Sequence, residues 1–326
     1  QCPRPDPLLG VQLLPPTWRR YVGDPLHPGR SRASPPGSCA AGRGPSPFLR
    51  DSAGHQGVVL GEEHCRPAGR WLDNVQNGAG LRRRACWRHR CRYGHGPHVR
   101  PHCVYCWGSN TSGRLGDGTT TNRLVPTQVS GVNNVIALAA GAEHTCAVLA
   151  DRTVVCWGRN NSGQLGDGTT TSRLTAVPVS GLGGVASLTA GDYFTCASLL
   201  DGSARCWGRN AYGQLGDGTT VSRLSPVTVV GLAGAEDVAS GTAHACAQLA
   251  SGRVRCWGRN NAGQLGDGSL TNRFTPVLVS NLSGVTQIAT GGQHSCAIQN
   301  DDVVRCWGDN SSGQLGDRRD PRRTGW

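Results

Sequence analysis

The chain has 326 residues, with 48 Gly, 15 Cys and no Met, and Arg supplies all 33 basic side chains. Without a run of about 18 apolar residues, the sequence predicts no membrane span. The net charge of +12 lies outside residues 106–316, where 13 Arg balance 13 acidic residues. A nucleic-acid footprint is expected on one face of the folded unit, so this distribution argues against a nucleic-acid partner.

The first segment, residues 1–102, is rich in Arg, Pro, Gly, Cys and His and has little strand pattern. We expect it to be poorly structured or to come from a shifted reading frame. The opening Gln1-Cys2-Pro3-Arg4 has neither an initiator Met nor a signal-peptide pattern, so we expect a fragment. A zinc cluster is the alternative interpretation of the cysteines and histidines at its end. Its ligands would be Cys86, His89, Cys91, His95, Cys103 and Cys106.

Residues 103–317 repeat with a period of fifty. The triplet Cys-Trp-Gly begins at Cys106, Cys156, Cys206, Cys256 and Cys306, and each is followed by Asn and then by Gly-x-Leu-Gly-Asp. Self-similarity at a fixed period is the sequence signature of repeat architectures.

Each repeat predicts four short strands. In one unit these are Val185–Ala190, Thr195–Leu199, Ala204–Trp207 and Ser225–Val230, and Asp201-Gly202 predicts a tight hairpin between the second and third. The predicted fold is therefore all-β, a β-propeller of four-stranded blades with about four and a half visible blades in an incomplete ring. A stacked solenoid is the rival, but its repeats usually have about 20–45 residues.

The motif Cys-Trp-Gly-x-Asn-x-x-Gly-Gln-Leu-Gly-Asp-Gly-Thr, with a later Gly-x-x-His-(Ser/Thr)-Cys-Ala segment, resembles the regulator of chromosome condensation repeat, especially its bacterial, cysteine-paired branch. The match covers residues 106–317. The resemblance implies a seven-bladed propeller that usually acts as a protein-binding platform. Some members exchange guanine nucleotides on a small GTPase, an activity that blade-building residues alone do not carry over.

Cysteines ten residues apart on each hairpin predict cross-strand disulfides and hence an oxidising compartment. Small buried thiols in a reduced protein are the alternative. The pairs are Cys146/Cys156, Cys196/Cys206, Cys246/Cys256 and Cys296/Cys306. We therefore expect an extracellular or cell-surface bacterial protein.

The repeated tryptophans predict packing between blades, with a stacking row for carbohydrate as the alternative. They are Trp107, Trp157, Trp207, Trp257 and Trp307. Histidines two residues before a cysteine do not indicate zinc, because Phe194 replaces the histidine in one repeat. We expect no metal and no cofactor. The Arg that recurs at Arg173 and its equivalents is expected to pair with a carboxylate or carbonyls of a neighbouring blade.

No catalytic constellation stands out beyond the repeat, so the chain is predicted not to be an enzyme. Binding residues should be those that vary between repeats, because variable loops gather on one rim. The candidates are Tyr212, Asn161 and Asn261. The predicted function is a non-enzymatic scaffold for protein–protein binding, secreted or surface-exposed; the alternative is a guanine-nucleotide exchange factor.

A one-nucleotide shift suggests that further repeats are hidden before residue 103. Read one base forward, Val59-Leu60-Gly61-Glu62 can encode Cys-Trp-Gly, and the following codons through Asn74 can encode the loop motif. A small deletion near Cys103 would restore the frame. The tail 318–326 departs abruptly from the repeat, and we interpret it as aberrant, with a second shift as one explanation.

Overall fold

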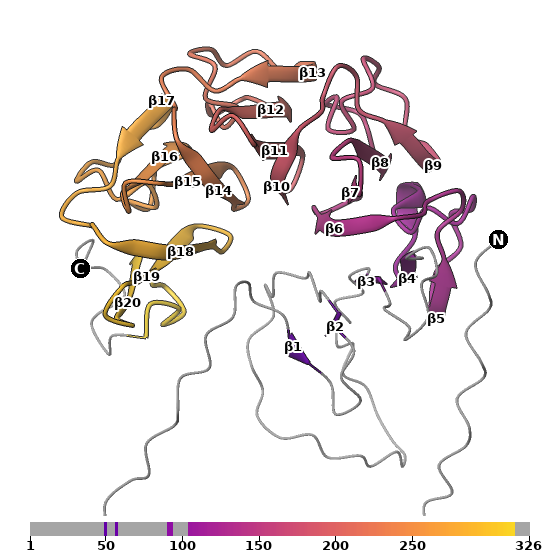
Figure 1. The fold of residues 1–326 in the computed structure, drawn as a ribbon, viewed down its shortest axis with the longest axis horizontal. Coiled ribbons are helices and arrows are strands. Elements are labelled where there is room, and N and C mark those ends of the chain that lie inside the picture. Colours follow the sequence, from indigo (N-terminus) through magenta and orange to yellow (C-terminus); the bar gives the residue numbers. More distant parts are fainter. Residues whose placement is uncertain (1–48, 51–55, 58–89, 94–103, 317–326) are drawn as a thin grey trace, which may run out of the picture. The chain divides into compact units, whose positions relative to one another are not determined.

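The computed structural model describes residues 49–50, 56–57, 90–93 and 104–316 (Figure 1). The chain divides into two compact units, residues 1–48 and 49–326, and every described residue belongs to the second. The frameshift interpretation, most of the alternative zinc cluster and the tail 318–326 lie outside the described residues. No helix in the described part of the chain is long and apolar enough to cross a membrane.

The structure is an all-β array of antiparallel sheets, which we call blades 1 to 5. Blade 1 contains β3 (Arg90–Tyr93), β4 (Val104–Gly108) and β5 (Arg123–Gln128). Blade 2 contains β6 (Val135–Ala140), β7 (His144–Leu149), β8 (Val154–Gly158) and β9 (Arg173–Pro178). Blade 3 contains β10 (Val185–Ala190), β11 (Phe194–Leu199), β12 (Ala204–Gly208) and β13 (Arg223–Thr228).

Blade 4 contains β14 (Ala235–Ser240), β15 (His244–Leu249), β16 (Val254–Gly258) and β17 (Arg273–Leu278). Blade 5 has three described strands, β18 (Val285–Thr290), β19 (His294–Gln299) and β20 (Val304–Gly308). A short 3₁₀ turn, η1, covers Thr111–Gly113. A two-residue pair joins β1 (Leu49–Arg50) to β2 (Gln56–Gly57).

The hairpins follow directly from local sequence. Between β11 and β12, Gly202 takes a positive φ of 78° and Asp201 Oδ1 accepts the Ser203 amide at 2.8 Å. A positive φ costs glycine little, and an Asp side chain closes a turn by bonding to backbone two residues on. The register then sets Cys196 opposite Cys206. The predicted hairpin is therefore confirmed.

The fourth strand differs from its predicted position. It runs over Arg223–Thr228 in blade 3, two residues earlier at each end than predicted. Arg223 pairs with Gly208 across the ladder, whereas Val230 donates its amide to Gly216 in the preceding loop. Pro226 lies inside this strand, and a proline is tolerated there because the strand is at the sheet edge.

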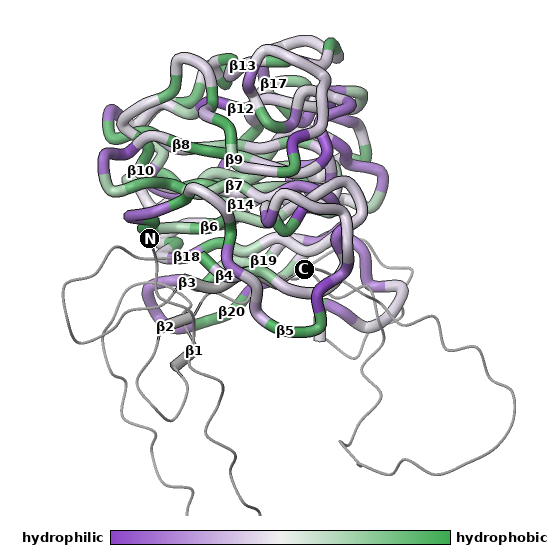
Figure 2. The backbone as a smooth tube through the Cα atoms, turned by 90° about the vertical axis from the view of Figure 1, so that its right-hand side faces the viewer, coloured by the Kyte–Doolittle hydropathy of each residue, from purple (hydrophilic) through white to green (hydrophobic). Residues whose placement is uncertain are grey.

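Successive blades stand side by side, with their first strands, β6, β10, β14 and β18, nearest one another (Figure 1). The core forms where the first strand of each blade packs against the first and second strands of the preceding blade. Figure 2 shows hydrophobic residues along the strands and hydrophilic residues at many of the connecting turns. The core is thus repeated at each boundary between two blades, which we call a seam and number by its blades.

Candidate functional site

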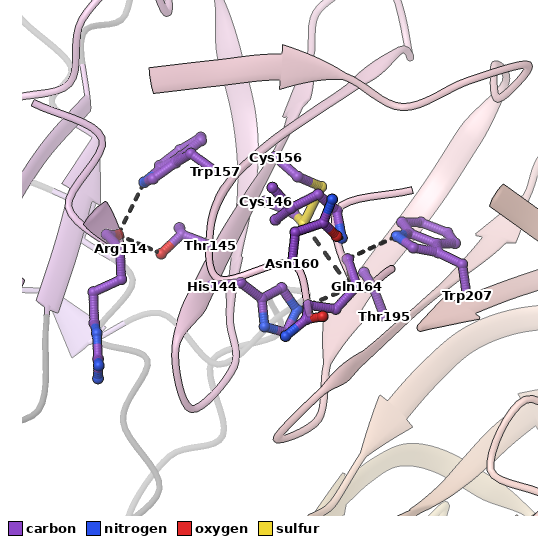
Figure 3. Close-up of a disulfide and its surroundings, with 11 residues drawn as sticks. Arg114, His144, Thr145, Cys146, Cys156, Trp157, Asn160, Gln164, Thr195 and Trp207 are labelled. Atoms are coloured by element: carbon purple, nitrogen blue, oxygen red, sulfur yellow. Dashed lines mark hydrogen bonds between the residues drawn. A yellow bond between two sulfur atoms is a disulfide. The ribbon is translucent and has the colours of Figure 1, made fainter. Parts of the chain in front are cut away.

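Each seam contains a buried tryptophan that reaches back into the preceding blade. Trp207 of β12 is fully buried, and its indole Nε1 donates to the Gln164 carbonyl of blade 2 at 2.9 Å (Figure 3). Gly166 leaves the space, since a Cβ there would lie 2.8 Å from that Nε1. The same bond joins Trp157 to Arg114, Trp257 to Gln214 and Trp307 to Gln264.

This burial excludes a carbohydrate-stacking row formed by Trp157, Trp207 and Trp257, because each of these rings is 0% exposed. Trp107 in blade 1 is half-buried, and Trp307 is 5% exposed.

A second layer pairs histidines with hydroxyls across alternate seams. His144 Nε2 lies 2.9 Å from Thr195 Oγ1 (Figure 3), and His244 Nε2 lies 2.9 Å from Ser295 Oγ. Both rings are fully buried, and burial lowers the pKa of each to about 3. These imidazoles are therefore neutral across the physiological range.

The exception at Phe194 has a structural explanation. The residue opposite it in blade 4 is Ala245, and both belong to one buried apolar cluster. Where the next blade offers a hydroxyl, the chain has His; where it offers a methyl group, the chain has Phe. The two positions vary together because a buried imidazole needs a hydrogen-bond partner and a phenyl ring does not.

The Gly-x-Leu-Gly-Asp loops are held by an internal network. Asn160 Nδ2 donates to Asp167 Oδ1 at 2.9 Å, and Arg173 Nε donates to Asp167 Oδ2 at 3.0 Å. Burial, the largest influence, raises the pKa of Asp167, but hydrogen bonds from Thr169 and Arg173 outweigh it and leave that pKa lowered. The expectation that Arg173 pairs with a neighbouring blade is wrong, because Asp167 belongs to the same blade as Arg173. The loop turns back on itself, so the arginine meets a carboxylate six residues earlier in the chain.

The eight candidate disulfide cysteines lie in four pairs at bonding distance, one in each of blades 2 to 5. Their S–S distances run from 2.05 to 2.14 Å. Each pair bridges directly opposed residues of a hairpin, as with Cys146 and Cys156 (Figure 3). These contacts are compatible with an extracellular protein.

One end of the blades carries both the loops after Cys-Trp-Gly and the short turns before the second strands; we call it the loop face. It comprises residues 109–122, 159–172, 209–222 and 259–272, with turns 141–143, 191–193, 241–243 and 291–293. Asn161 and Asn261 are exposed here, and Tyr212 is half-buried. The Arg259 guanidinium lies 5.1 Å from the Tyr212 ring centre. The three candidates therefore share a face but lie in different loops, in blades 2, 3 and 4.

Above the tryptophan layer, the residue that precedes the buried His or Phe changes from seam to seam. In seam 1–2, Glu143 Oε2 accepts Arg159 Nη1 at 2.6 Å, and its Oε1 lies 3.6 Å from Arg114 Nη2. In seam 2–3 the equivalent residue is Tyr193, whose ring lies 6.0 Å from the guanidinium carbons of both Arg159 and Arg209. In seam 3–4 it is Ala243.

Seam 3–4 contains a cleft of about 130 Å³, which the small side chain of Ala243 lines. Blade 3 contributes Asp192, Tyr193, Arg209 and Tyr212 to its wall, and blade 4 contributes Thr242 and Arg259. Tyr212 is the one sequence candidate that lines it. Glu143 fills the corresponding position of seam 1–2 with a carboxylate.

Sequence reasoning missed Tyr193, Arg209, Arg259 and Glu143. The signal was present: within the Gly-x-x-(His/Phe) turn, the third residue changes from Glu143 to Tyr193, Ala243 and Gln293. This position is as variable between repeats as the loop tips.

A family model described as the RCC1-like domain matches residues 99–324. Solved structures share the fold. Human WBSCR16 matches with a TM-score of 0.62 and 22% identity, covering 70% of this chain and 61% of that one. Yeast RCC1 (Prp20) bound to Kap60 matches with a TM-score of 0.59 and 21% identity, covering 76% of this chain and 62% of that one.

A further structure of Prp20p, from Saccharomyces cerevisiae, has a TM-score of 0.61 at 21% identity and covers 73% of this chain. Its description refers to binding of Gsp1p and histones. The present chain spans 60–62% of the length of the matched chains in these three solved structures. At these identities the likeness shows the fold alone.

Proposed function

Because the chain belongs to the RCC1-like domain family, we propose that it is a non-enzymatic β-propeller scaffold that binds another protein through its loop face. The observation that supports the proposal is that repeated and variable residues differ in where they lie. Those repeated in every blade are buried or bonded within the fold. Asn161, Tyr212 and Asn261, at positions that change between blades, all lie on the loop face.

The chemistry of this face supports a protein partner. Arg and Tyr are enriched at protein–protein interfaces, where they combine apolar contact with directed hydrogen bonds. The loop face carries Arg159, Arg209 and Arg259 in step, next to Tyr193 and Tyr212. The rigid loops beneath them, held by the Asn–Asp–Arg network, limit the entropy lost on binding.

We propose an extracellular or cell-surface location from the four cysteine pairs. Disulfides persist in oxidising compartments and are rare where thiols are kept reduced. Thiol titration of native material prepared without reductant is expected to find none of these eight cysteines reactive. Finding most of them reactive would contradict the location.

The alternative, exchange of guanine nucleotide on a small GTPase, rests on the similarity to yeast Prp20, described by its binding to Gsp1p. A cytosolic GTPase regulator would hold the eight cysteines as thiols. Release of labelled GDP from candidate GTPases of the source organism measures this activity directly. Acceleration that depends on loop-face residues would favour the alternative over the scaffold.

Site-specific photo-crosslinking tests the scaffold function. A photoreactive amino acid at Asn161 or Asn261 is expected to capture the same partner protein from the native surroundings of the chain. The same probe at Asp151 or Ser251, exposed in the turns at the other end of the blades, serves as the control. Capture from the control positions alone would place binding at the end of the blades opposite the loop face and would contradict the proposal.

A further inference from the structure

The cleft in seam 3–4 contains two arginines that form no ion pair with a described residue. In the described part of the chain, no carboxylate lies within ion-pair distance of Arg209 or Arg259. Their guanidinium groups instead lie near Tyr193 and Tyr212, at 6.0 and 5.1 Å from the ring centres. An aromatic ring occupies a guanidinium face and leaves its N–H edge available for an acceptor.

Seam 1–2 shows which acceptor such an N–H edge binds. There the chain supplies Glu143, which binds Arg159 at 2.6 Å and also receives the Ser112 hydroxyl at 3.4 Å. Arg259 stands one hundred residues after Arg159, and Ala243 one hundred after Glu143. The two seams therefore have the same arginine, but among the described residues only the arginine of seam 1–2 is bonded to a carboxylate.

We propose that the cleft in seam 3–4 binds an acidic side chain of the partner protein, which supplies from outside the carboxylate that Glu143 supplies within seam 1–2. This inference rests on the proposed scaffold function and identifies the chemistry of its partner. A carboxylate matches the N–H fork of arginine in shape and charge. The cleft volume of about 130 Å³ suits a single side chain rather than a folded element.

Asp192 in the cleft wall favours a peptide carboxylate over a phosphate. Its negative charge repels a dianion more strongly than a monoanion. Nucleic acid is disfavoured by charge balance, because residues 106–316 carry 13 Arg and 13 acids. The expected partner therefore has an exposed loop with Glu or Asp at its tip.

Calorimetric titration of the full chain with a blocked peptide tests the inference. The probe contains two Glu residues flanked by Gly, and its matched control has Gln in their place. We expect weak binding of the Glu peptide and at least about tenfold weaker binding of the Gln peptide. Arg259→Gln and Ala243→Glu should each weaken the Glu peptide about tenfold, the second by filling the site from within.

Arg255→Gln is the matched charge control, since Arg255 lies on β16 and bonds to the Gly231 carbonyl. It should leave binding unchanged. Equal loss from Arg255→Gln and Arg259→Gln would reveal non-specific charge attraction and overturn the inference. Displacement of the peptide by inorganic phosphate at lower concentration would overturn it in favour of a phosphate site.

The two proposals fail separately. If crosslinking from Asn161 and Asn261 captures a partner and Arg259→Gln does not weaken that capture, the scaffold function stands and the acidic site is wrong. If the Glu peptide binds in the cleft but the loop face captures no protein, the site stands and the scaffold function is wrong.

Discussion

Each seam has a buried tryptophan layer and a solvent-exposed end, which we call its mouth and which contains Glu143, Tyr193 or Ala243. The two regions differ in how much their residues vary between blades. In the buried layer, Trp157, Trp207 and Trp257 make the same bond to the preceding blade. At the mouth, the equivalent position is Glu143, Tyr193 or Ala243, and the result is an ion pair, an aromatic bridge or a cleft. Close packing allows few different side chains in the interior. At the solvent-exposed mouth, any side chain that avoids a clash can be accommodated.

This comparison teaches that stability and recognition are assigned to different depths of the same seam. Changes in the buried layer should reduce the free energy of unfolding. Changes at the mouth should alter ligand binding and leave that free energy almost unchanged.

The strongest test of the buried layer is Trp207→Ala. It removes a fully buried ring and its bond to Gln164, so we expect a loss of about 3–5 kcal/mol in the free energy of unfolding. Urea denaturation followed by circular dichroism measures the loss. Tyr212→Ala at the mouth is the control, with a loss below about 1 kcal/mol. Similar losses for both variants would contradict the separation by depth.

Removal of one disulfide should have the next largest effect. The double variant Cys196→Ala, Cys206→Ala is expected to lose about 2–3 kcal/mol, because the loop that the bond closes is short. Thermal unfolding without reductant gives the measurement. Excess reductant should lower the unfolding temperature of the native chain below that of the variant, because the reductant opens the other disulfides as well. A native chain insensitive to reductant would show that its cysteines are not bonded.

The buried histidines predict acid sensitivity. Burial lowers the pKa of His144 and His244 to about 3, whereas the unfolded chain has a histidine pKa of about 6.5. At pH values between these two pKa values, the histidines of the unfolded state bind protons that those of the folded state do not. Stability is therefore full above pH 6.5 and falls as the pH falls, by about 2 kcal/mol per histidine at pH 5.

Urea midpoints at pH 7.5, 6 and 5 measure this loss. The variant His144→Phe, Thr195→Ala, which copies the Phe194–Ala245 arrangement, should show a smaller loss than the native chain. An unchanged pH dependence in that variant would exclude His144 as a source.

A double-mutant cycle tests the coupling of histidine and hydroxyl across seam 4–5. His244→Phe and Ser295→Ala are each expected to destabilise the fold, since each leaves a buried polar atom unpaired or forces a ring against a hydroxyl. The double variant should recover about 1–2 kcal/mol relative to the sum of the two. Additive effects in urea denaturation would show that the two positions vary independently.

The smallest stability effect is expected from Glu143→Ala at the mouth of seam 1–2. Its ion pairs are partly exposed, so the expected loss is below about 1 kcal/mol. The same change frees Arg159 and should create a second weak site for the Glu peptide. Calorimetric stoichiometry rising from one to two checks this outcome, and a stoichiometry that stays at one would contradict the equivalence of the two seams.

Much of the fold was predictable because its signals are local. Asp-Gly at 201–202, strand alternation and the cysteine spacing are properties of neighbouring residues, and the hairpins formed as predicted. The start of the fourth strand at Arg223 was not predictable, because it depends on an ion pair to Asp217 and on pairing with Gly208. Among the site residues, only Tyr212 of the cleft was identified in advance.

Identical sequence also has different outcomes in different blades. Val254 and Val304 both open a Val-Arg-Cys-Trp-Gly strand, yet they are 0% and 62% exposed. Val254 packs in one buried apolar cluster with Val285, Ala297 and Trp307 of blade 5, whereas no further blade follows blade 5 among the described residues. Burial at this position therefore depends on the next blade and cannot be inferred from the residue itself.

The amino-acid sequence by itself determined the repeat, the β-class of each unit, the hairpins and the pairing partners of the cysteines, since all of these arise within fifty residues. Only the tertiary structure decided which side chains meet across a seam: Trp207 with Gln164, His144 with Thr195, and Ala243 with the cleft between Arg209 and Arg259. These contacts join different repeats. Packing and desolvation, rather than local backbone preference, select them.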